Sequence, residues 1–241
     1  MTNIEVENMQ IDILTIFPDM FESVFKYGVI SKALEKKLFT LKIHNLRDFS
    51  PLKHSRVDDE PYGGGPGMVM RPEPIFNSVR EIIKRSSFEK KDINVILLTP
   101  EGEKLNQSIM SSISSFKKLI IICGRYEGVD ERVKKCLVDR LISIGDYVIS
   151  GGEMAAMVLV DGLVRLIPGV LGNIESLDKE SFSGNLLDYS QYTRPFDFEG
   201  MKVPDILLSG NHKKITKWRK EIAKAKTERL RPDLLENKEN Q

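Results

Sequence analysis

The chain has 241 residues, a length that suits one large domain or two smaller ones and can bury about 70% of the unfolded surface. Its 36 Lys and Arg residues nearly balance its 35 Asp and Glu residues, so the net charge is +1 at pH 7. This balance excludes a uniformly basic, histone-like protein and a uniformly acidic one. With 41% hydrophobic and 29% charged residues, the composition is that of a globular chain rather than a disordered one.

The charge is unevenly distributed along the chain. Residues 209–232 contain nine Lys or Arg and only two Glu, a net charge of +7, so the remainder of the chain carries −6. We therefore expect a small basic element near the C-terminus that can contact a polyanion, and an acidic-leaning body.

Cysteine, histidine and apolar patterns exclude several classes of protein. Cys123 and Cys136 lack C-x-x-C spacing and are too few for a disulfide framework, so we expect both to be reduced and inert. No histidine has metal-ligand spacing with them, and no metal site is predicted. The longest apolar region, residues 154–171, contains Asp161 and Arg165 and is too polar to span a bilayer. The polar, acidic N-terminus is unlike a signal peptide, which favours a cytoplasmic protein without a membrane partner.

The first quarter of the chain predicts two strands, one helix and a long loop. Residues 10–17 alternate and are β-branched, which predicts a strand, and residues 41–46 predict a second one. Between them, residues 20–38 have apolar positions near helical spacing, although Gly28 weakens the middle of this helix. Residues 48–68 are rich in Pro, Gly and charge and lack periodicity; long loops of this kind are usually functional or disordered.

The next hundred residues alternate continuous apolar runs, typical of strands buried on both faces, with helical patterns. Strands are predicted at 94–98, 118–123, 141–144 and 147–149, and helices at 74–85, 105–116, 130–137 and 153–166. This alternation predicts an α/β domain with a mostly parallel sheet.

The sequence changes in character after this domain. Residues 172–184 are polar and predict a flexible linker. Beyond them, Ile215, Trp218, Ile222 and Ala225 fall on one face of a helix whose other face is basic, which predicts a small, all-α C-terminal domain. The predicted boundaries are residues 1–171 for the α/β domain, 172–186 for the linker and 187–241 for the helical domain.

Three glycine-rich segments are candidate ligand sites. Residues 58–68 carry four glycines in five positions, which lets the backbone approach a ligand, but they lack the Lys of a Walker A loop and also fit a mobile surface loop. Residues 123–132 follow a buried strand, at the sheet edge where α/β proteins bind ligands; Arg125 and Glu127 also fit a solvated ion pair. Residues 143–153 open a helix whose N-terminus attracts anions, or form a plain turn.

Two charged segments follow. The carboxylates within residues 165–195 are candidate general bases, although most would be surface charges if each stood alone. Residues 209–220 predict a basic helix suited to phosphate contacts, with Ser209 or Asn211 as its cap, or else an ordinary solvated helix. Trp218 is expected to pack in the core rather than to stack on a base.

Taken together and in this order, the motifs resemble the bacterial tRNA (guanine-N1)-methyltransferases of the TrmD type, which are SPOUT-class enzymes. The matching stretches are IFPDMF, VDDEPYGGGPGM, CGRYEGVDER, SIGDYVISGGE, RLIPGVLG, SF…LLD…YTRP and VPDILLSGNHKKI…WR. The resemblance starts at Met9, so residues 1–8 are expected to be an extension or to result from the choice of an upstream start codon, and no function is assigned to them. It implies methyl transfer from S-adenosylmethionine to N1 of guanosine 37 of tRNA, next to the anticodon and preceded by guanosine 36, which supports reading-frame maintenance.

The resemblance also implies a fold and a cofactor site. The α/β domain would contain a deep trefoil knot, an exception to the general rule against knots, and would form a homodimer whose active site lies between the protomers. The knot would bind S-adenosylmethionine mainly through backbone atoms. The implied cofactor-binding residues are Leu97, Leu98, Thr99, Pro100, Gly102, Gly124, Arg125, Tyr126, Glu127, Ile144, Gly145, Tyr147, Val148, Ile149, Gly151 and Gly152.

Catalytic and substrate-binding roles are implied in the same way. Glu180 stands where the family has an aspartate that takes the N1 proton, with Asp178 as the alternative base, and Arg165 would stabilise charge on the guanine oxygen. Glu127 matches a residue tied to Mg²⁺ dependence, and Asp188 one that holds the target base. The implied substrate-binding residues are Asp58, Tyr62, Gly63, Gly64, His212, Lys213 and Lys217.

The sequence also allows two functions other than methyl transfer. The chain could be an RNA-binding module that has kept the SPOUT fold and lost activity, but the intact glycine loops, Arg165 and Glu180 argue against this. It could also be a nucleotide hydrolase that uses residues 61–67, which the missing Walker lysine disfavours.

Overall fold

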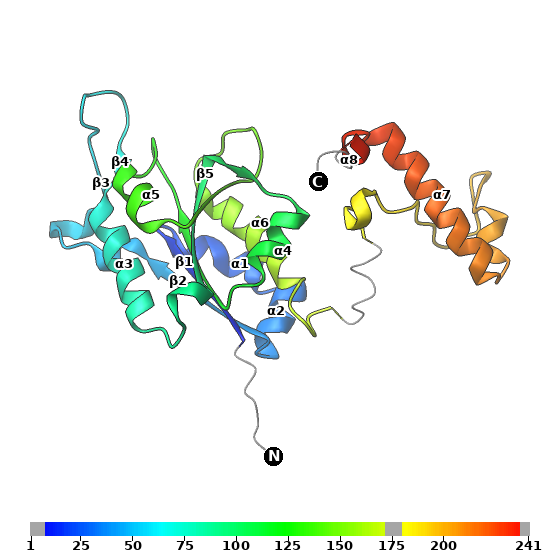
Figure 1. Ribbon diagram of the computed structural model, residues 1–241, viewed down its shortest axis with the longest axis horizontal. Coiled ribbons are helices and arrows are strands. Elements are labelled where there is room, and N and C mark those ends of the chain that lie inside the picture. The colour runs from blue at the N-terminus through cyan, green and yellow to red at the C-terminus, as the bar shows by residue number, and fades with distance from the viewer. Residues whose placement is uncertain (1–7, 172–179, 237–241) are drawn as a thin grey trace, which may run out of the picture. The chain divides into compact units, whose positions relative to one another are not determined.

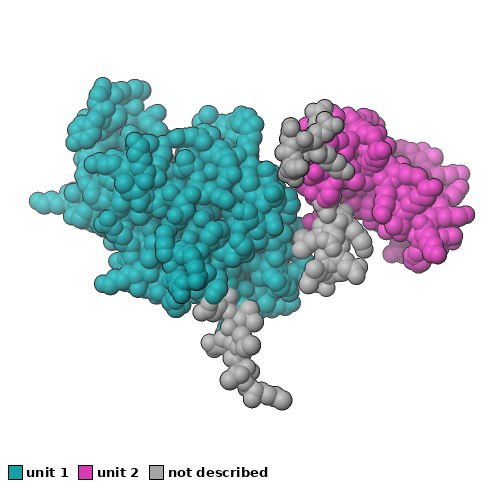
Figure 2. All heavy atoms as spheres, in the orientation of Figure 1, with its two compact units in different colours: residues 1–172 teal, residues 173–241 magenta. Residues whose placement is uncertain are grey.

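The computed structural model of the chain describes residues 8–171 and 180–236. The chain divides into two compact units, unit 1 (residues 1–172) and unit 2 (residues 173–241), which Figure 2 shows in separate colours. The expectations for residues 1–7, for the linker residues 172–179 and for Asp178 as the alternative base lie outside the described residues.

Unit 1 is built on a five-stranded sheet whose strand order is β2-β1-β6-β5-β7 and whose neighbouring strands all run parallel (Figure 1). The strands are β1 (Met9–Thr15), β2 (Phe39–Asn45), β5 (Ile93–Lys104), β6 (Lys118–Cys123) and β7 (Arg140–Ser143). Every residue of the central strand β6 is buried, as expected for a strand covered on both faces. The α/β class and the mostly parallel sheet are therefore confirmed.

Helices cover both faces of this sheet and enclose two separate cores. They are α1 (Glu22–Phe25), α2 (Gly28–Glu35), α3 (Pro72–Lys84), α4 (Gln107–Ile113), α5 (Glu131–Leu137) and α6 (Gly152–Val164). Apolar side chains of α1, α2, α4 and α6 form one core, and those of α3 and α5 form the other. Strand residues alternate between the two: in β5, Ile96 and Leu98 join the first core, whereas Val95 and Leu97 join the second.

Three local predictions for unit 1 were wrong. The single helix expected at residues 20–38 is broken into a 3₁₀ turn, α1 and α2, because Gly28 has a φ of +71°, a conformation that ends a regular helix. Residues 147–149 form no strand, and Val148 is 90% exposed. The loop expected at residues 48–68 contains a short strand, β3 (Asp58–Asp59), which pairs antiparallel with β4 (Val69–Met70).

A buried charged cluster lies in the middle of the sheet. The carboxylate of Asp12 on β1 is 2.6 Å from Nε2 of His44 and 2.7 Å from Nζ of Lys118. Burial by itself raises the pKa of Asp12, but the hydrogen bonds from His44 and Lys118 outweigh it and hold this pKa below its ordinary value. The cluster thus keeps a charged carboxylate inside the fold.

Unit 2 is mainly helical but is not all-α as predicted. Its long helix is α7 (His212–Leu230), followed by α8 (Asp233–Glu236). A hairpin of two short strands, β8 (Asp197–Phe198) and β9 (Met201–Lys202), precedes them. Gly200, with a φ of +82°, makes the turn of this hairpin, which no alternating pattern in the sequence indicated.

Helix α7 begins and packs largely as its pattern predicts. The side chain of Asn211 accepts a hydrogen bond from the backbone N–H of Lys214 at 3.1 Å, which makes Asn211 the N-cap. Ile215 is buried, but Trp218 is only half-buried and Ala225 is exposed. The buried face therefore includes Ala223 and Thr227 instead of Ala225. Within residues 8–171 and 180–236, no helix is both long and apolar enough to cross a membrane.

Candidate functional site

A pocket of about 500 Å³ opens in unit 1 where strands β6 and β7 end and β5 passes between them. Three segments line it: residues 97–101 on β5, residues 124–129 after β6, and residues 142–152, from the end of β7 to the start of α6. All of the predicted cofactor-binding residues except Gly102 are among the lining residues. The structure thus brings together segments that lie far apart in the sequence, at the sheet edge where α/β proteins bind ligands.

Two glycines have packing roles at this pocket. Gly102 lies outside its lining, and a Cβ there would come within 2.4 Å of the backbone nitrogen of Ile142, so glycine permits the close approach of β5 and β7. A Cβ at Gly152 would lie 2.8 Å from Cα of Cys123 and 2.9 Å from N of Gly124. The N–H of Gly152 instead donates to the carbonyl of Gly124 at 2.8 Å, which holds the start of α6 against the end of β6.

The side chain of Arg125 is bound within the protein, although the residue lines the pocket. Its Nε donates to the carboxylate of Glu153 at 2.9 Å, and its Nη1 donates to the carbonyl of Ser150 at 3.1 Å. The guanidinium also lies over the ring of Phe17, 4.7 Å from the centroid. The sequence offered a solvated Arg125–Glu127 pair as one interpretation, but the charged partner of Arg125 is the buried Glu153, which sequence reasoning missed.

Tyr126 connects the pocket to the start of the glycine-rich loop. Its φ is +60°, a conformation that is uncommon for a residue other than glycine and often occurs at functional sites. Burial, followed by the negative charge of Asp58, raises the pKa of the Tyr126 phenol, whereas Arg47 acts in the opposite direction. These interactions place Asp58, a predicted substrate-binding residue, beside a residue that lines the pocket.

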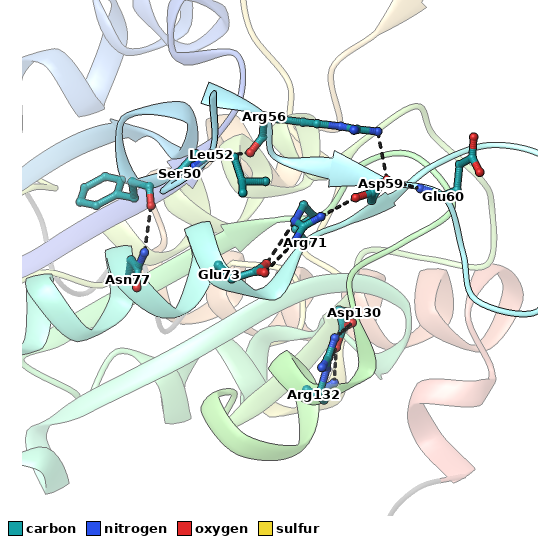
Figure 3. Close-up of polar contacts among 11 residues, drawn as sticks. Ser50, Leu52, Arg56, Asp59, Glu60, Arg71, Glu73, Asn77, Asp130 and Arg132 are labelled. Atoms are coloured by element: carbon teal, nitrogen blue, oxygen red, sulfur yellow. Dashed lines mark hydrogen bonds and ion pairs between the residues drawn. The ribbon is translucent and has the colours of Figure 1, made fainter. Parts of the chain in front are cut away.

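The stem of the glycine-rich loop is held by ion pairs. Figure 3 shows Arg71, at the start of α3, pointing toward both Asp59 and Glu73; its Nη2 is 2.7 Å from Glu73. Arg56 binds the same Asp59 at 3.0 Å. Because Asp59 belongs to β3, these contacts fix the strand from which the loop leaves the body of the unit.

The tip of the loop has the opposite character. Tyr62 is fully exposed, and Gly63, Gly64 and Gly65 all have positive φ angles between +77° and +128°. A Cβ at any of these three glycines would meet no atom within 4 Å, so they serve the backbone conformation rather than close packing. The loop therefore combines a fixed stem with an open tip that a partner can contact.

Backbone hydrogen bonds join this stem directly to the wall of the pocket. The N–H of Glu127 donates to the carbonyl of Met68 at 3.0 Å, and the N–H of Met70 donates to the carbonyl of Gly128 at 2.9 Å. A Cβ at Gly67 would overlap the side chain of Glu127, which explains the fourth glycine. The predicted substrate loop and one predicted cofactor loop thus form one connected structure.

Of the predicted catalytic residues in unit 1, Glu127 lines this pocket and Arg165 does not. Arg165 follows the last residue of α6, whereas the first residue, Gly152, lies at the pocket; 13 helical steps separate them by about 20 Å. Glu180 and Asp188 belong to unit 2. There the carboxylate of Asp188 accepts hydrogen bonds from the N–H of Tyr189 at 2.7 Å and from Gln191 at 2.9 Å.

Cys123 is the last residue of β6, directly before the pocket residue Gly124. The thiol of Cys123 is fully buried, and burial together with the neighbouring Glu153 raises its pKa well above the ordinary value, so it stays protonated. Among residues 8–171 and 180–236, no group of three or more His, Cys, Asp or Glu side chains gathers in a way that could hold a metal ion.

The predicted tRNA-binding residues of unit 2 lie on the first turns of α7. His212, Lys213 and Lys217 are all exposed. Lys217 is 3.8 Å from Glu221 one turn later, a solvated pair that contributes little to stability. These side chains can therefore contact phosphate groups without disturbing the fold.

Comparison with known proteins gives one consistent result. The sequence model of the family described as tRNA (guanine-1)-methyltransferase TrmD matches residues 9–237. The chain is 58% identical, over 228 residues, to the tRNA (guanine-N(1)-)-methyltransferase of Dictyoglomus turgidum, a match that covers 95% of this chain and 90% of that one. It is 51% identical over 231 residues to the proteins of the same name from Bacillus cereus and Bacillus anthracis, covering 96% of this chain and 93% of theirs.

Proposed function

Because this chain belongs to the TrmD family of tRNA (guanine-1)-methyltransferases, we propose that it transfers a methyl group from S-adenosylmethionine to N1 of a guanine in tRNA. The target is guanosine 37, which follows guanosine 36. The observation that carries this proposal is the pocket: residues 124–129 and 143–152 of its lining belong to motifs that match the family, and residues 97–101 lie within the range that the family model matches. Since tRNA is the substrate, the reaction belongs in the cytoplasm.

The pocket is suited to S-adenosylmethionine. Its volume of about 500 Å³ lies in the range of small-molecule sites, and its lining mixes apolar side chains with backbone of glycine-rich turns. Leu97, Leu98 and Ile144 offer apolar surface for an adenine ring. Gly124 and Gly151 have no side chain, so the backbone itself forms this part of the pocket wall, beside the ribose and the amino-acid part. When bound, this co-substrate supplies an activated methyl group on a sulfonium.

Two residues of the chain act on the proton of guanine N1 and on the negative charge that develops when this proton leaves. Glu180 takes the proton from guanine N1, which is protonated at neutral pH and must lose this proton to become a nucleophile. Arg165 stabilises the negative charge that develops on the guanine oxygen as the proton leaves. N1 then forms a bond to the methyl carbon while the carbon–sulfur bond breaks, so no covalent enzyme intermediate is needed. The buried, protonated thiol of Cys123 agrees with this route.

The distance between Arg165 and the pocket supports a homodimer with the active site between protomers. About 20 Å of helix separates the two within one chain, and we propose that a second copy brings its Arg165 to the pocket. On α6, Met154 and Val158 are 53% and 49% exposed and lie one turn apart, opposite the face that packs in the core. We propose this apolar stripe as part of the dimer interface, and the deep trefoil knot of the family as the fold of the pocket.

The proposed mechanism contains no step on Mg²⁺. Glu127, which matches a family residue tied to Mg²⁺ dependence, is exposed and packs over Gly67. Among the described residues, it belongs to no group of three or more His, Cys, Asp or Glu side chains that could hold a metal ion. This donor set does not fit a resident metal ion.

A direct assay tests the proposed function. The protein is mixed with S-adenosylmethionine labelled on the methyl group and with a tRNA transcript that carries guanosine at positions 36 and 37. We expect the label on N1 of guanosine 37, and its loss when a matched transcript carries adenosine at position 37. Absence of N1-methylguanosine from the first transcript would favour an inactive RNA-binding module, and label at another position would contradict the proposed target.

The basic start of α7 yields a prediction for tRNA binding. Replacing Lys213 and Lys217 with Ala is expected to weaken binding and to flatten the dependence of log K on log salt by about one unit per lost phosphate contact. Filter binding at several salt concentrations measures this slope. The matched control removes two exposed lysines of unit 1, Lys32 in α2 and Lys36 directly after it, and should leave the slope unchanged. Equal slopes for the α7 variant and wild type would argue against phosphate contacts at this helix.

A further inference from the structure

Glu153 is a buried carboxylate in unit 1 that the mechanism does not use. It is the second residue of α6 and has no exposed surface. Its Oε1 accepts a hydrogen bond from the hydroxyl of Thr15 at 2.8 Å, and its Oε2 accepts one from Nε of Arg125 at 2.9 Å. A buried charge is tolerated only when it is paired and hydrogen-bonded, and the N-terminus of a helix adds further stabilisation. Both carboxylate oxygens are thus bound by the protein itself.

The partners of Glu153 belong to three different segments. Thr15 ends strand β1, and Arg125 follows β6 in the pocket loop of residues 124–129. The side chain of Arg125 donates to the carbonyl of Ser150 in the other pocket loop, which lies within residues 142–152, and Arg125 forms a β-bridge with Gly151 there. Phe17, two residues after Thr15, covers the guanidinium. One carboxylate therefore connects the end of β1 to two of the three segments that line the pocket.

We propose that Glu153 is a positioning residue that sets the separation of the two pocket loops through Arg125. Glu153 itself is absent from the pocket lining, whereas Arg125, Ser150 and Gly151 belong to it. The inference rests on the proposed function, because it assigns the cost of losing Glu153 to S-adenosylmethionine binding. It also gives a role to the start of the IFPDMF motif and the residue before it: Phe17 and Thr15 hold the pocket together from outside.

The Asp12 cluster provides a matched control within the same unit. Asp12 is also a buried carboxylate with two hydrogen-bonding partners, His44 and Lys118, but none of these three residues lines the pocket. Asp12→Asn and Glu153→Gln each remove one buried negative charge from a paired site. Both variants are therefore expected to lower the melting temperature, and only Glu153→Gln to change the pocket.

The experiment measures the Kd of S-adenosylmethionine by calorimetry without tRNA, together with kcat and KM in the methyl-transfer assay. For Glu153→Gln we expect Kd and KM to rise at least about tenfold, because the loops lose their fixed spacing, while kcat at saturating S-adenosylmethionine falls by less than about threefold. Asp12→Asn should leave Kd within about twofold of wild type. Thr15→Ser keeps the hydroxyl and should bind like wild type, whereas Thr15→Val should bind several-fold more weakly.

Each outcome separates this inference from the proposed function. A Glu153→Gln protein that melts earlier but binds S-adenosylmethionine like wild type would show a purely structural role and overturn the inference. If Glu153→Gln does not fold, the Thr15 pair decides, and equal Kd values for Thr15→Val and Thr15→Ser overturn it. A wild-type protein that binds no S-adenosylmethionine contradicts the proposed function itself.

Discussion

Replacing Glu180 with Gln is expected to lower turnover by about 10²- to 10⁴-fold, the contribution that a positioned general base makes to a proton transfer. Glutamine keeps the size of the side chain and one acceptor oxygen but cannot accept the N1 proton. Because the role proposed for Glu180 concerns the proton of the substrate and not the cofactor, the Kd of S-adenosylmethionine should not change. Single-turnover methyl transfer and calorimetry measure the two quantities separately.

Two further variants control the assignment of the base. Glu180→Asp restores the residue that the family has at this position and should keep most of the activity. Asp178→Asn removes the neighbouring carboxylate and should leave turnover near the wild-type value. If Asp178→Asn is inactive and Glu180→Gln is active, the base is Asp178.

Arg165→Ala should lower turnover by about 10²- to 10³-fold, because a group that stabilises developing charge on the guanine oxygen is lost. The proposed sharing of the active site between two protomers can be tested with a second variant. Gly152→Ala places a Cβ against the backbone of Cys123 and Gly124, forces the pocket loops apart and should nearly abolish S-adenosylmethionine binding. Each variant alone is then expected to be inactive for a different reason: Arg165→Ala lacks the charge-stabilising group, and Gly152→Ala lacks a pocket that binds the cofactor.

Mixing the two inactive variants tests whether the active site is shared. In a mixed dimer, the Arg165→Ala chain supplies an intact pocket and the Gly152→Ala chain supplies an intact Arg165. Random subunit exchange should recover about a quarter of wild-type activity, because half of the dimers contain one complete site. Size-exclusion chromatography controls for dimer formation and circular dichroism for folding. A mixture of folded dimers that stays inactive would place Arg165 and the pocket of one active site on the same chain.

Sequence patterns located the elements of unit 1 well because its strands and helices bury long, regular apolar faces. The prediction for residues 118–123 matches β6, a strand in which every residue is buried. Errors occurred where single residues or very short pairings decide the structure. Gly28 breaks a helical pattern, and β3 and β4 are too short to show alternation. The hairpin of unit 2 escaped detection for the same reason.

The site was predicted in part. Resemblance to the family named residues that line one pocket, but it did not show that Gly102, which lies outside the lining, permits the close approach of β5 to Ile142. It also could not show that Arg125 uses its side chain to bind Glu153 and Ser150. A Glu at the start of a helix normally indicates a solvated, favourable charge near the helix N-terminus. Only the packing of β1 against α6 makes this one a buried partner.

What the sequence by itself determined is the class of fold, the order of its main elements and, through its motifs, the family and the chemistry to expect. These follow from periodicity and from residue types, which are local properties of the chain. Only the tertiary structure decided which groups lie next to one another: the three segments that line one pocket, Tyr126 beside Asp58, and the buried carboxylate of Glu153 with its partners. The physical reason is that parallel strands bring distant segments to a common edge, and burial then selects which polar groups must pair.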